Sequence, residues 1–454
     1  MLKRTSLAAL AMVAALFTAP SVQAQSLSDS LTGAYNTSGL LDQNRALLRA
    51  ADEGVAQAVA ATLPVLNWSI NANRTGVTDP IRIGTNSALL RITADVVLYS
   101  GGANTLAIEA QKETVLATRQ SLRNVEQDVL LRAVQAHMNL VRDFEFVQLR
   151  QNNVRLITQE FRAAQDRFDV GEVTRTDVAL AEARLASARS LLAAAEGNLA
   201  ISAEEYRIAV GVAPGRANAV SPATITRSLR DAQAFARQNH PRIREAQHTV
   251  SAAELNIRRA EASLRPSLSA NAFITRDNEA NESGQIGLTL GGPIYTGGLI
   301  SSQIRQFTAN RDAARSGLHL ITLAIEQEVA NAFSLLQVAR ASRQASDEQI
   351  IAARVAFQGV REEATLGSRT TLDVLNAEQE LLDAQANLIA AQSDEVVASY
   401  SLLAAMGLLT ADDLNLPVQQ YDPVEYYNLV KNSPTFDSEQ GKALDRVLEA
   451  IGQN

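Results

Sequence analysis

The chain has 454 residues, a formal net charge of −8 and no cysteine, so disulfides, thiolate metal sites and cysteine nucleophiles are excluded. The acidic balance argues against nucleic acid as a partner. Aromatic residues make up only 4% of the chain, which favours long helices with narrow packing seams over one large globular core.

Residues 1–24 have the features of a secretory signal peptide. A basic start is followed by a short apolar run at 7–17, and Ala24 ends a small-residue sequence that is typical of a cleavage site. We expect the mature chain to begin at Gln25, and the loss of two positive charges then changes the formal charge from −8 to −10. The alternative is an uncleaved anchor. Beyond the signal, no run of about 18 apolar residues occurs, so we expect no transmembrane helix.

Proline is absent from two long blocks of the sequence, between positions 80 and 214 and between positions 293 and 417. Because proline breaks helices, each block is expected to be mainly helical. Residues 104–168 also lack glycine, and their apolar residues recur every three or four positions, as on one face of a helix. A helix of that length reaches on the order of 100 Å and needs other helices beside it.

Apolar and polar residues alternate in the segments that precede each helical block. After Pro64, for example, Leu66, Trp68 and Ile70 interleave with asparagine and serine. Four such segments of about ten residues predict two β-hairpins, at 65–99 and 267–295, and the pattern is typical of membrane β-barrel strands. Two ordinary soluble hairpins are the alternative.

The two halves of the chain repeat each other. Tyr99-Ser100-Gly101-Gly102 aligns with Tyr295-Thr296-Gly297-Gly298, and the same offset of 196 positions continues to Gly211 and Gly407. We therefore expect a first structural repeat at 25–211, a linker at 212–235, a second repeat at 236–410, and a C-terminal tail at 411–454. The expected helices are 28–62, 104–168 and 174–210 in the first repeat, and 240–263, 300–364 and 370–406 in the second.

The number of strands limits the possible assemblies. Four strands cannot close a membrane barrel, and open sheet edges are not tolerated in lipid. Membrane barrels of this kind have even strand numbers from eight upward, so two chains would supply eight strands and three would supply twelve. The pattern alone does not choose between them.

These residues resemble the outer-membrane efflux (TolC) family over nearly the whole mature chain. The resemblance is carried by Ala34-Tyr35-Asn36 and Asn239-His240-Pro241, by the Tyr-x-Gly-Gly sequences after the hairpins, and above all by two turn motifs at 170–178 and 366–375. It implies an α+β membrane protein with a long α-helical barrel, or tunnel, and a transmembrane β-barrel with four strands per protomer. It also implies a homotrimer, with the linker and tail in an equatorial belt.

In function, the resemblance implies the outer-membrane exit duct of a tripartite efflux pump or a type I secretion system in a Gram-negative bacterium. Export of small molecules or proteins is then passive. The implied partners are outer-membrane lipid, a periplasmic adaptor (membrane fusion) protein and an inner-membrane transporter of the ABC, RND or MFS type. The competing interpretation is a periplasmic coiled-coil adaptor or scaffold without a pore, which has no need of the alternating segments.

We expect no enzyme activity, cofactor or metal. The sequence contains no phosphate-binding loop and no nucleophile elbow. Its four histidines have no ligand spacing. The abundant carboxylates are those of solvated helix faces.

The turn motifs contain most of the candidate site residues. Gly171 and Gly367 are expected to end helices as C-caps, and by resemblance they mark the helix-turn tips that contact the adaptor. Asp373 is expected to cap the following helix, and by resemblance it forms an acidic ring at the periplasmic entrance that favours cations. Asn376 stands where the family can carry a second acid, so we expect a weaker ring.

By the same resemblance, Arg369 is expected to keep the entrance closed by pairing with Asp177 and Thr176 of the other turn. A solvated ion pair of little consequence is the alternative. Ala364 replaces a tyrosine that supports this contact in a well-known family member, so closure is expected to be looser. Trp68 is the candidate for an aromatic residue at the membrane interface.

Overall fold

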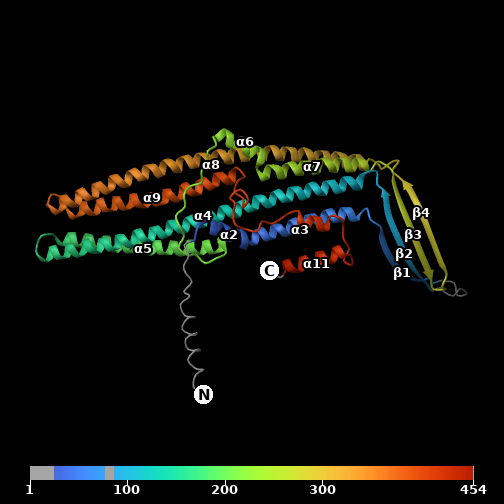
Figure 1. The fold of residues 1–454 in the computed structure, drawn as a ribbon, viewed down its shortest axis with the longest axis horizontal. Coiled ribbons are helices and arrows are strands. Elements are labelled where there is room, and N and C mark those ends of the chain that lie inside the picture. The colour runs from blue at the N-terminus through green and yellow to red at the C-terminus, as the bar shows by residue number, and fades with distance from the viewer. Residues whose placement is uncertain (1–24, 77–85, 453–454) are drawn as a thin grey trace, which may run out of the picture. The chain divides into compact units, whose positions relative to one another are not determined.

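The computed structural model describes residues 25–76 and 86–452 (Figure 1). The expected signal peptide, residues 1–24, lies outside the described residues. Within these ranges the chain is mainly helical, and four strands form one sheet.

The elements form two series with the same order. The first series is α2 (Leu27–Thr37), α3 (Gly39–Ala60), β1 (Val65–Arg74), β2 (Asn86–Tyr99), α4 (Ala103–Asp169) and α5 (Arg175–Val210). The second series is α6 (Leu229–Asn239), α7 (Pro241–Ala262), β3 (Ser267–Asp277), β4 (Glu282–Gly291), α8 (Leu299–Thr365) and α9 (Thr371–Ala405). The short helices α10 (Glu425–Val430) and α11 (Glu439–Gly452) follow. The long helices α4 and α8 have the same length, 67 residues, as a structural repeat requires.

The helices that open each series differ from our expectation. The helix expected at 28–62 is divided into α2 and α3, because the backbone of Ser38 is extended (φ −72°, ψ 107°). His240 is extended in the same way between α6 and α7 (φ −62°, ψ 129°). Because α6 begins at Leu229, the second series starts inside the segment 212–235 that we interpreted as a linker.

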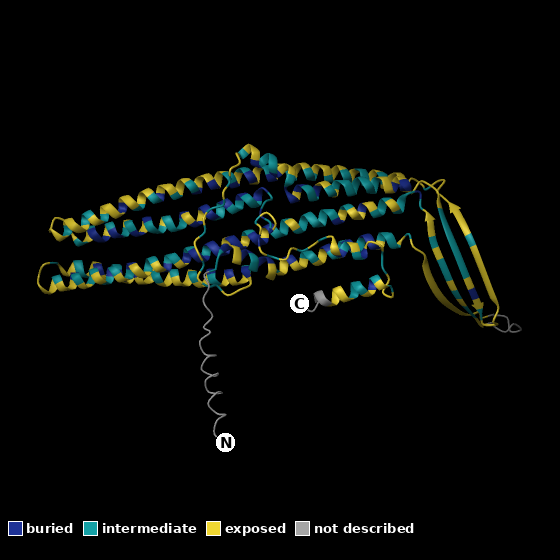
Figure 2. Ribbon diagram, in the orientation of Figure 1, coloured by how far each residue is buried: buried dark blue, intermediate teal, exposed yellow. Residues whose placement is uncertain are grey.

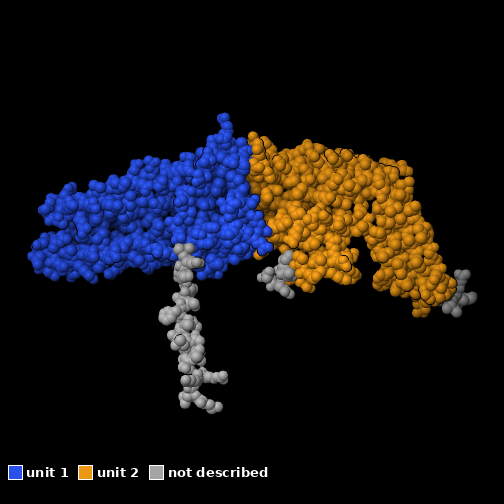
Figure 3. All heavy atoms as spheres, in the orientation of Figure 1, with its two compact units in different colours: residues 1–41, 126–236, 327–420 blue, residues 42–125, 237–326, 421–454 orange. Residues whose placement is uncertain are grey.

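The chain divides into two compact units, which Figure 3 colours separately. Unit 1 contains the described residues of 1–41 together with 126–236 and 327–420. Unit 2 contains 42–125, 237–326 and the described residues of 421–454. Both long helices contribute residues to each unit, and the sheet belongs to unit 2.

A buried hydrogen-bond network joins α2, α4 and α5 in unit 1. The Ser30 hydroxyl lies 2.8 Å from His137 Nδ1 and 2.8 Å from the Tyr206 hydroxyl, and all three side chains are fully buried. His137 Nε2 lies 3.0 Å from the carbonyl oxygen of Asn218, which can only accept, so Nε2 carries the proton and Nδ1 accepts from Ser30. Burial lowers the pKa of His137, in agreement with a neutral ring. The Tyr206 hydroxyl also lies 3.1 Å from Gln25 Oε1, which is a second acceptor for its single proton.

The sheet in unit 2 is an antiparallel meander with the strand order β1-β2-β3-β4. Trp68 pairs with Ile92 across β1 and β2, and Ile92 pairs with Ile274 across β2 and β3. The hairpins of the two series therefore form one sheet through the β2–β3 pair. Strands β1 and β4 are the two edges of this sheet.

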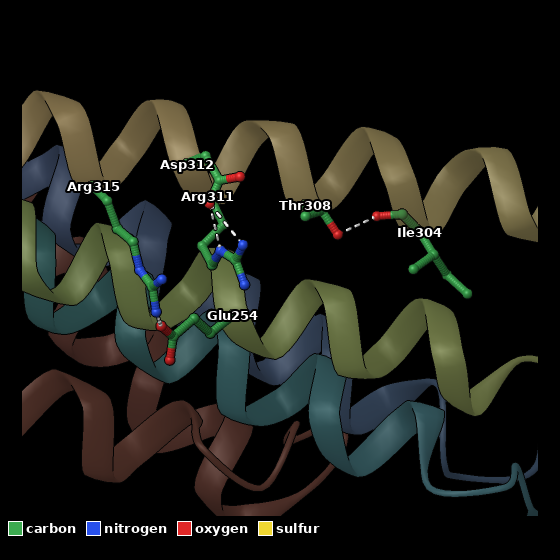
Figure 4. A network of polar contacts seen from close by, with 6 residues as sticks. All are labelled: Glu254, Ile304, Thr308, Arg311, Asp312 and Arg315. Carbon is green, nitrogen blue, oxygen red and sulfur yellow. Dashed lines mark hydrogen bonds and ion pairs between the residues drawn. The ribbon is translucent and has the colours of Figure 1, made fainter.

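Helix α7 lies beside the first part of α8 in unit 2 (Figure 4). Arg315 Nη2 of α8 is 2.6 Å from Glu254 Oε1 of α7. On the same stretch of α8, Arg311 pairs with its neighbour Asp312, at 2.7 Å. Such solvent-exposed pairs contribute little to stability.

The C-terminal tail packs onto α3 and α4 in unit 2. Tyr421 and Tyr427 lie against a buried cluster that includes Leu48. The guanidinium of Arg45 lies 5.5 Å from the centre of the Tyr421 ring, and that of Arg119 lies 5.4 Å from the centre of the Tyr427 ring. The tail is thus anchored by aromatic side chains that stack with cations and bury apolar surface.

Tyr206→Phe is expected to destabilise the protein by about 1 kcal/mol, because Ser30 and Gln25 lose a buried hydrogen-bond partner. Urea denaturation of the detergent-extracted protein, followed by circular dichroism at fixed protein concentration, measures the change. Tyr295→Phe is the matched control, since Tyr295 is 89% exposed and its hydroxyl loses nothing that is buried. Equal midpoints for the two variants would show that the network adds no stability.

Candidate functional site

Two glycine turns in unit 1 contain most of the predicted site residues. The first turn joins α4 to α5, and Gly171 there has a φ of +82° and donates its N–H to the carbonyl of Phe168 at 2.9 Å. The second turn joins α8 to α9, and Gly367 has a φ of +79° and donates to the carbonyl of Ala364 at 3.1 Å. A positive φ costs other residues about 1–2 kcal/mol, so glycine is the residue that fits both C-caps.

Each turn ends in a capping box that starts the next helix. Asp177 N donates to Thr174 Oγ1 at 3.3 Å, and the Asp177 carboxylate accepts from Thr174 N at 2.9 Å. The pair Thr370 and Asp373 repeats this arrangement with distances of 3.2 Å and 3.0 Å. These hydrogen bonds hold the pKa of Asp373 and the pKa of Asp177 below their usual range. Both carboxylates are therefore ionised at neutral pH.

Arg369 has an ion-pair partner in its own turn. Its Nε lies 2.8 Å from Glu363 Oε2, and both side chains are about half exposed. The expected closure partner, Asp177, is held by Thr174 in the other turn. Within one chain, Arg369 and Asp177 each have a local partner, so their contact with each other and with Thr176 stays a prediction. We did not predict Glu363; an acid six residues before an arginine, across a glycine turn, was the available signal.

A seam between the two helix pairs lies close to these turns. Arg184 Nη2 of α5 donates to Asn376 Oδ1 of α9 at 3.1 Å. Leu375, the residue before Asn376, packs with Ile157 of α4 and Leu185 of α5 in a buried cluster. Asn376 therefore contacts a cationic side chain on the other helix pair.

Glu378 of α9 is buried in the same seam. Its side chain is 4% exposed, and Oε1 accepts from Asn153 Nδ2 of α4 at 3.2 Å. Among the described residues, Oε2 has no hydrogen-bond partner. Burial raises the pKa of Glu378 to about 7, and the charge of Glu160 acts in the same direction. We did not predict this residue, although it lies four positions from both Val374 and Leu382, which are buried on the same face of α9.

The sheet in unit 2 has one apolar face. Residues paired across antiparallel strands share a face, so the register gathers most of the apolar side chains on one side. These are Leu66, Trp68, Ile70, Leu90, Ile92, Ala94, Val96, Leu268, Ala270, Ala272, Ile274, Ile286, Leu288 and Leu290. In the single chain this face is open: Trp68 is 74% exposed and Ile286 is 87% exposed. Figure 2 shows the two edge strands coloured mainly as exposed. An exposed apolar surface of this extent indicates a contact surface.

Among the described residues, no group of three or more His, Asp or Glu residues could hold a metal ion. Near the turns and the seam, the shifted pKa values of three carboxyl groups are explained by helix capping at Asp177 and Asp373 and by burial at Glu378. In the part of the chain that is described, no helix is long and apolar enough to cross a membrane.

Gly367→Ala is expected to destabilise the second turn by about 1 kcal/mol, because alanine would have to adopt a positive φ. Gly359→Ala is the matched control, since an added Cβ meets nothing within 4 Å in α8. Alanine in a helix interior is favoured over glycine by about 1 kcal/mol. Hydrogen exchange of peptides from this part of the chain measures both effects. Increased protection of the turn in Gly367→Ala would contradict the C-cap assignment.

Comparison with known proteins identifies the family. The family described as "Outer membrane efflux protein" matches residues 34–212 and 235–408. The outer membrane efflux protein BepC of Brucella suis is 38% identical over 420 residues, which are 89% of this chain and 91% of that protein. The outer membrane protein TolC of Escherichia coli is 24% identical over 80% of this chain and 78% of its own length.

Solved structures share the fold. The CmeC outer membrane channel of Campylobacter jejuni matches with a TM-score of 0.75 at 16% identity, over 90% of this chain and 90% of that chain. The outer membrane protein VceC of Vibrio cholerae matches with a TM-score of 0.71 at 20% identity, over 84% of this chain and 96% of that chain. Since the family match spans both structural repeats, the chain belongs to the outer membrane efflux protein family.

Proposed function

We propose that the chain is one protomer of an exit duct through which a tripartite efflux pump or a type I secretion system passively exports small molecules or proteins. The observation that carries this proposal is the four-stranded sheet with an exposed apolar face and two open edges, in a chain of the efflux family. Membership establishes the outer membrane of a Gram-negative cell as its location. The relatives are channels, so a periplasmic adaptor or scaffold without a pore is not supported.

The duct is a homotrimer in which three sheets close one barrel of twelve strands. Strands β1 and β4 are edges in the single chain, and lipid offers no hydrogen bonds to an open edge. Two chains would give eight strands, and a barrel of eight is filled by its own side chains or holds one small ligand. A duct needs a wider barrel, so three chains fit the function better than two.

Helix α8 supports the same assembly. Several of its aliphatic side chains are exposed in the single chain, namely Leu320, Leu323, Leu335, Val338, Ile351 and Val355. Long helices are stabilised mainly by packing against other helices. Neighbouring copies that line up into an α-helical tunnel would cover these side chains.

The apolar face of the sheet contacts outer-membrane lipid. This assignment leaves the opposite face, which carries residues such as Asn67, Thr93 and Gln285, toward the interior of the barrel. Polar and apolar residues divide in this way between the lumen and the lipid in membrane barrels. Trp68 on the apolar face is the aromatic residue that we assign to the membrane interface.

The glycine turns of unit 1 form the periplasmic entrance. Three copies of Asp373 make an acidic ring, which is supported by the low pKa of this carboxyl group. Arg369 closes the entrance by contacting Asp177 and Thr176 of a neighbouring helix pair. The tips at Gly171 and Gly367 contact a periplasmic adaptor protein, which links the duct to an inner-membrane transporter of the ABC, RND or MFS type.

Ile92→Lys is expected to impair insertion into outer-membrane lipid, because a lysine on the lipid face costs free energy that depends on its depth and reaches about 2–4 kcal/mol at the centre of the bilayer. The neighbouring Thr93→Lys is the matched control on the opposite face of β2. Heat-modifiable migration and detergent extraction of each variant from membranes measure insertion. Equal insertion of both variants would contradict the assignment of the apolar face to lipid.

The entrance residues are tested by single-channel recording in planar bilayers. Asp373→Asn is expected to reduce the preference for cations, because it removes the charge of the ring. Asp383→Asn removes the same charge ten residues further along α9 and is expected to leave the selectivity unchanged. Arg369→Ser is expected to raise the conductance by weakening closure, and an unchanged conductance would show that Arg369 has no part in the gate.

A further inference from the structure

The seam between α4 and α9 contains a carboxyl group in an apolar setting. Glu378 lies one helical turn from Leu375, which packs with Ile157 in a buried cluster. Its contact across the seam is the hydrogen bond from Asn153 Nδ2 to Oε1 at 3.2 Å. A buried carboxylate is costly unless its oxygens are hydrogen-bonded, and Oε2 has no such partner among the described residues. The protonated form suits this position better than the ionised form.

Within the single chain, the two residues that the internal repeat aligns at this position differ in burial. Glu182 of α5 occupies the position that aligns with Glu378 of α9, at the offset of 196 positions. The side chain of Glu182 is exposed, whereas that of Glu378 is 4% exposed. A glutamate at this point of the repeat does not by itself require burial, so the packing of α9 against α4 causes it.

We propose that the buried carboxyl group of Glu378 acts as a latch that holds α9 against α4 beside the glycine turns, closed while Glu378 is protonated and released when ionisation draws the carboxylate out toward water. This inference rests on the proposed function in one respect only, namely that release of the latch frees the first turns of α9, which lie at the proposed entrance. The contact itself lies within unit 1 of a single chain and does not depend on a pore.

The charges that act on Glu378 come from two neighbouring helices. Glu160 of α4 opposes its ionisation, and Arg361 of α8 favours it. Asn153 donates to the carboxyl group and stabilises the ionised form, but burial outweighs both favourable contributions and sets the pKa at about 7. A carboxyl pKa raised in the closed state stabilises that state at low pH, and this stabilisation is lost as the pH rises through 7. The latch is thus closed at pH 6 and weakened at pH 8.

The entrance acids do not titrate in this range. The pKa values of Asp373 and Asp177 are held below the usual carboxyl range by their capping boxes. Their charge is constant between pH 6 and pH 8. A response in that window therefore does not come from these two capping carboxylates.

Hydrogen exchange of the full mature protein in detergent tests the latch directly. The observable is the protection of peptides from 371–385 at pH 6 and pH 8, after correction for the intrinsic exchange rate. With a carboxyl pKa of about 7 in the closed state and 4.5 in the released state, opening is expected to rise roughly tenfold over this interval. Protection that is the same at both pH values in the wild-type protein would overturn the proposal.

Three substitutions assign the effect. Glu378→Gln keeps the shape and cannot ionise, so the pH dependence is expected to vanish while the peptides stay protected. Glu182→Gln is the matched control at the repeat-related position and should behave as the wild-type protein does. Asn153→Ala removes the donor that favours the ionised form, so the transition should move to higher pH. A pH response that persists in Glu378→Gln, or that disappears in Glu182→Gln, would overturn the assignment.

Single-channel recording separates the latch from the proposed function. If both hold, the wild-type conductance rises from pH 6 to pH 8 and that of Glu378→Gln does not. A pH-dependent protection that needs Glu378, in a protein that forms no channel, supports the latch and contradicts the duct. A channel whose protection and conductance are the same for the wild-type protein and Glu378→Gln at both pH values supports the duct and contradicts the latch.

Discussion

The two edge strands of the sheet carry backbone N–H and C=O groups that have no neighbouring strand among the described residues of one copy, and the architecture depends on how these groups are paired. The sheet is a complete meander from β1 to β4, but each of its edge strands offers a row of N–H and C=O groups to a further strand. In water such an edge invites aggregation, and in lipid it cannot persist. The apolar face of the sheet also requires a contact surface outside the single chain, because side chains such as Ile286 are exposed among the described residues. Both requirements are met together when several copies join edge to edge with the apolar face toward lipid.

Helical packing in unit 1 depends on small and aliphatic side chains. Few aromatic side chains are available, and the seams are built from alanine, leucine and valine, with a small number of polar contacts between helices. Positions such as Asn153, Arg184 and Asn376 make those contacts near the turns. Because they are few, each can influence how firmly the two helix pairs are held. The same region carries ionised capping carboxylates, so stability of the helix ends and charge at the proposed entrance would come from the same residues.

The order of elements could be read from the sequence because strong local signals mark it. Gly171 and Gly367 end helices through positive φ, and long stretches without proline specify α4 and α8. The break at Ser38 was missed although a local signal was present, since serine is a common helix N-cap and the Ser38 hydroxyl accepts from Leu41 N at 3.4 Å at the start of α3. The helices of the tail could not be predicted, because α10 has only six residues, which are too few to show a helical repeat of apolar positions.

The sequence predicted the candidate site only where the role of a residue depends on its near neighbours along the chain. The capping roles of Asp177 and Asp373 follow from the threonine three residues earlier, and the structure shows both boxes. The pair of Arg369 with Glu363 was not predicted, because the family resemblance implied a partner for Arg369 in the other turn. Glu378 was missed because its burial depends on α4, which is more than 200 positions away in the sequence.

The number of chains in the detergent-extracted assembly is the measurement that tests the account most directly. Native mass spectrometry of the mature protein, released from mild detergent, gives this number without assuming a pore. The account predicts three chains, which supply twelve strands and leave no open edge. A stable single chain, or an assembly of two, would contradict the closed barrel and with it the proposed duct.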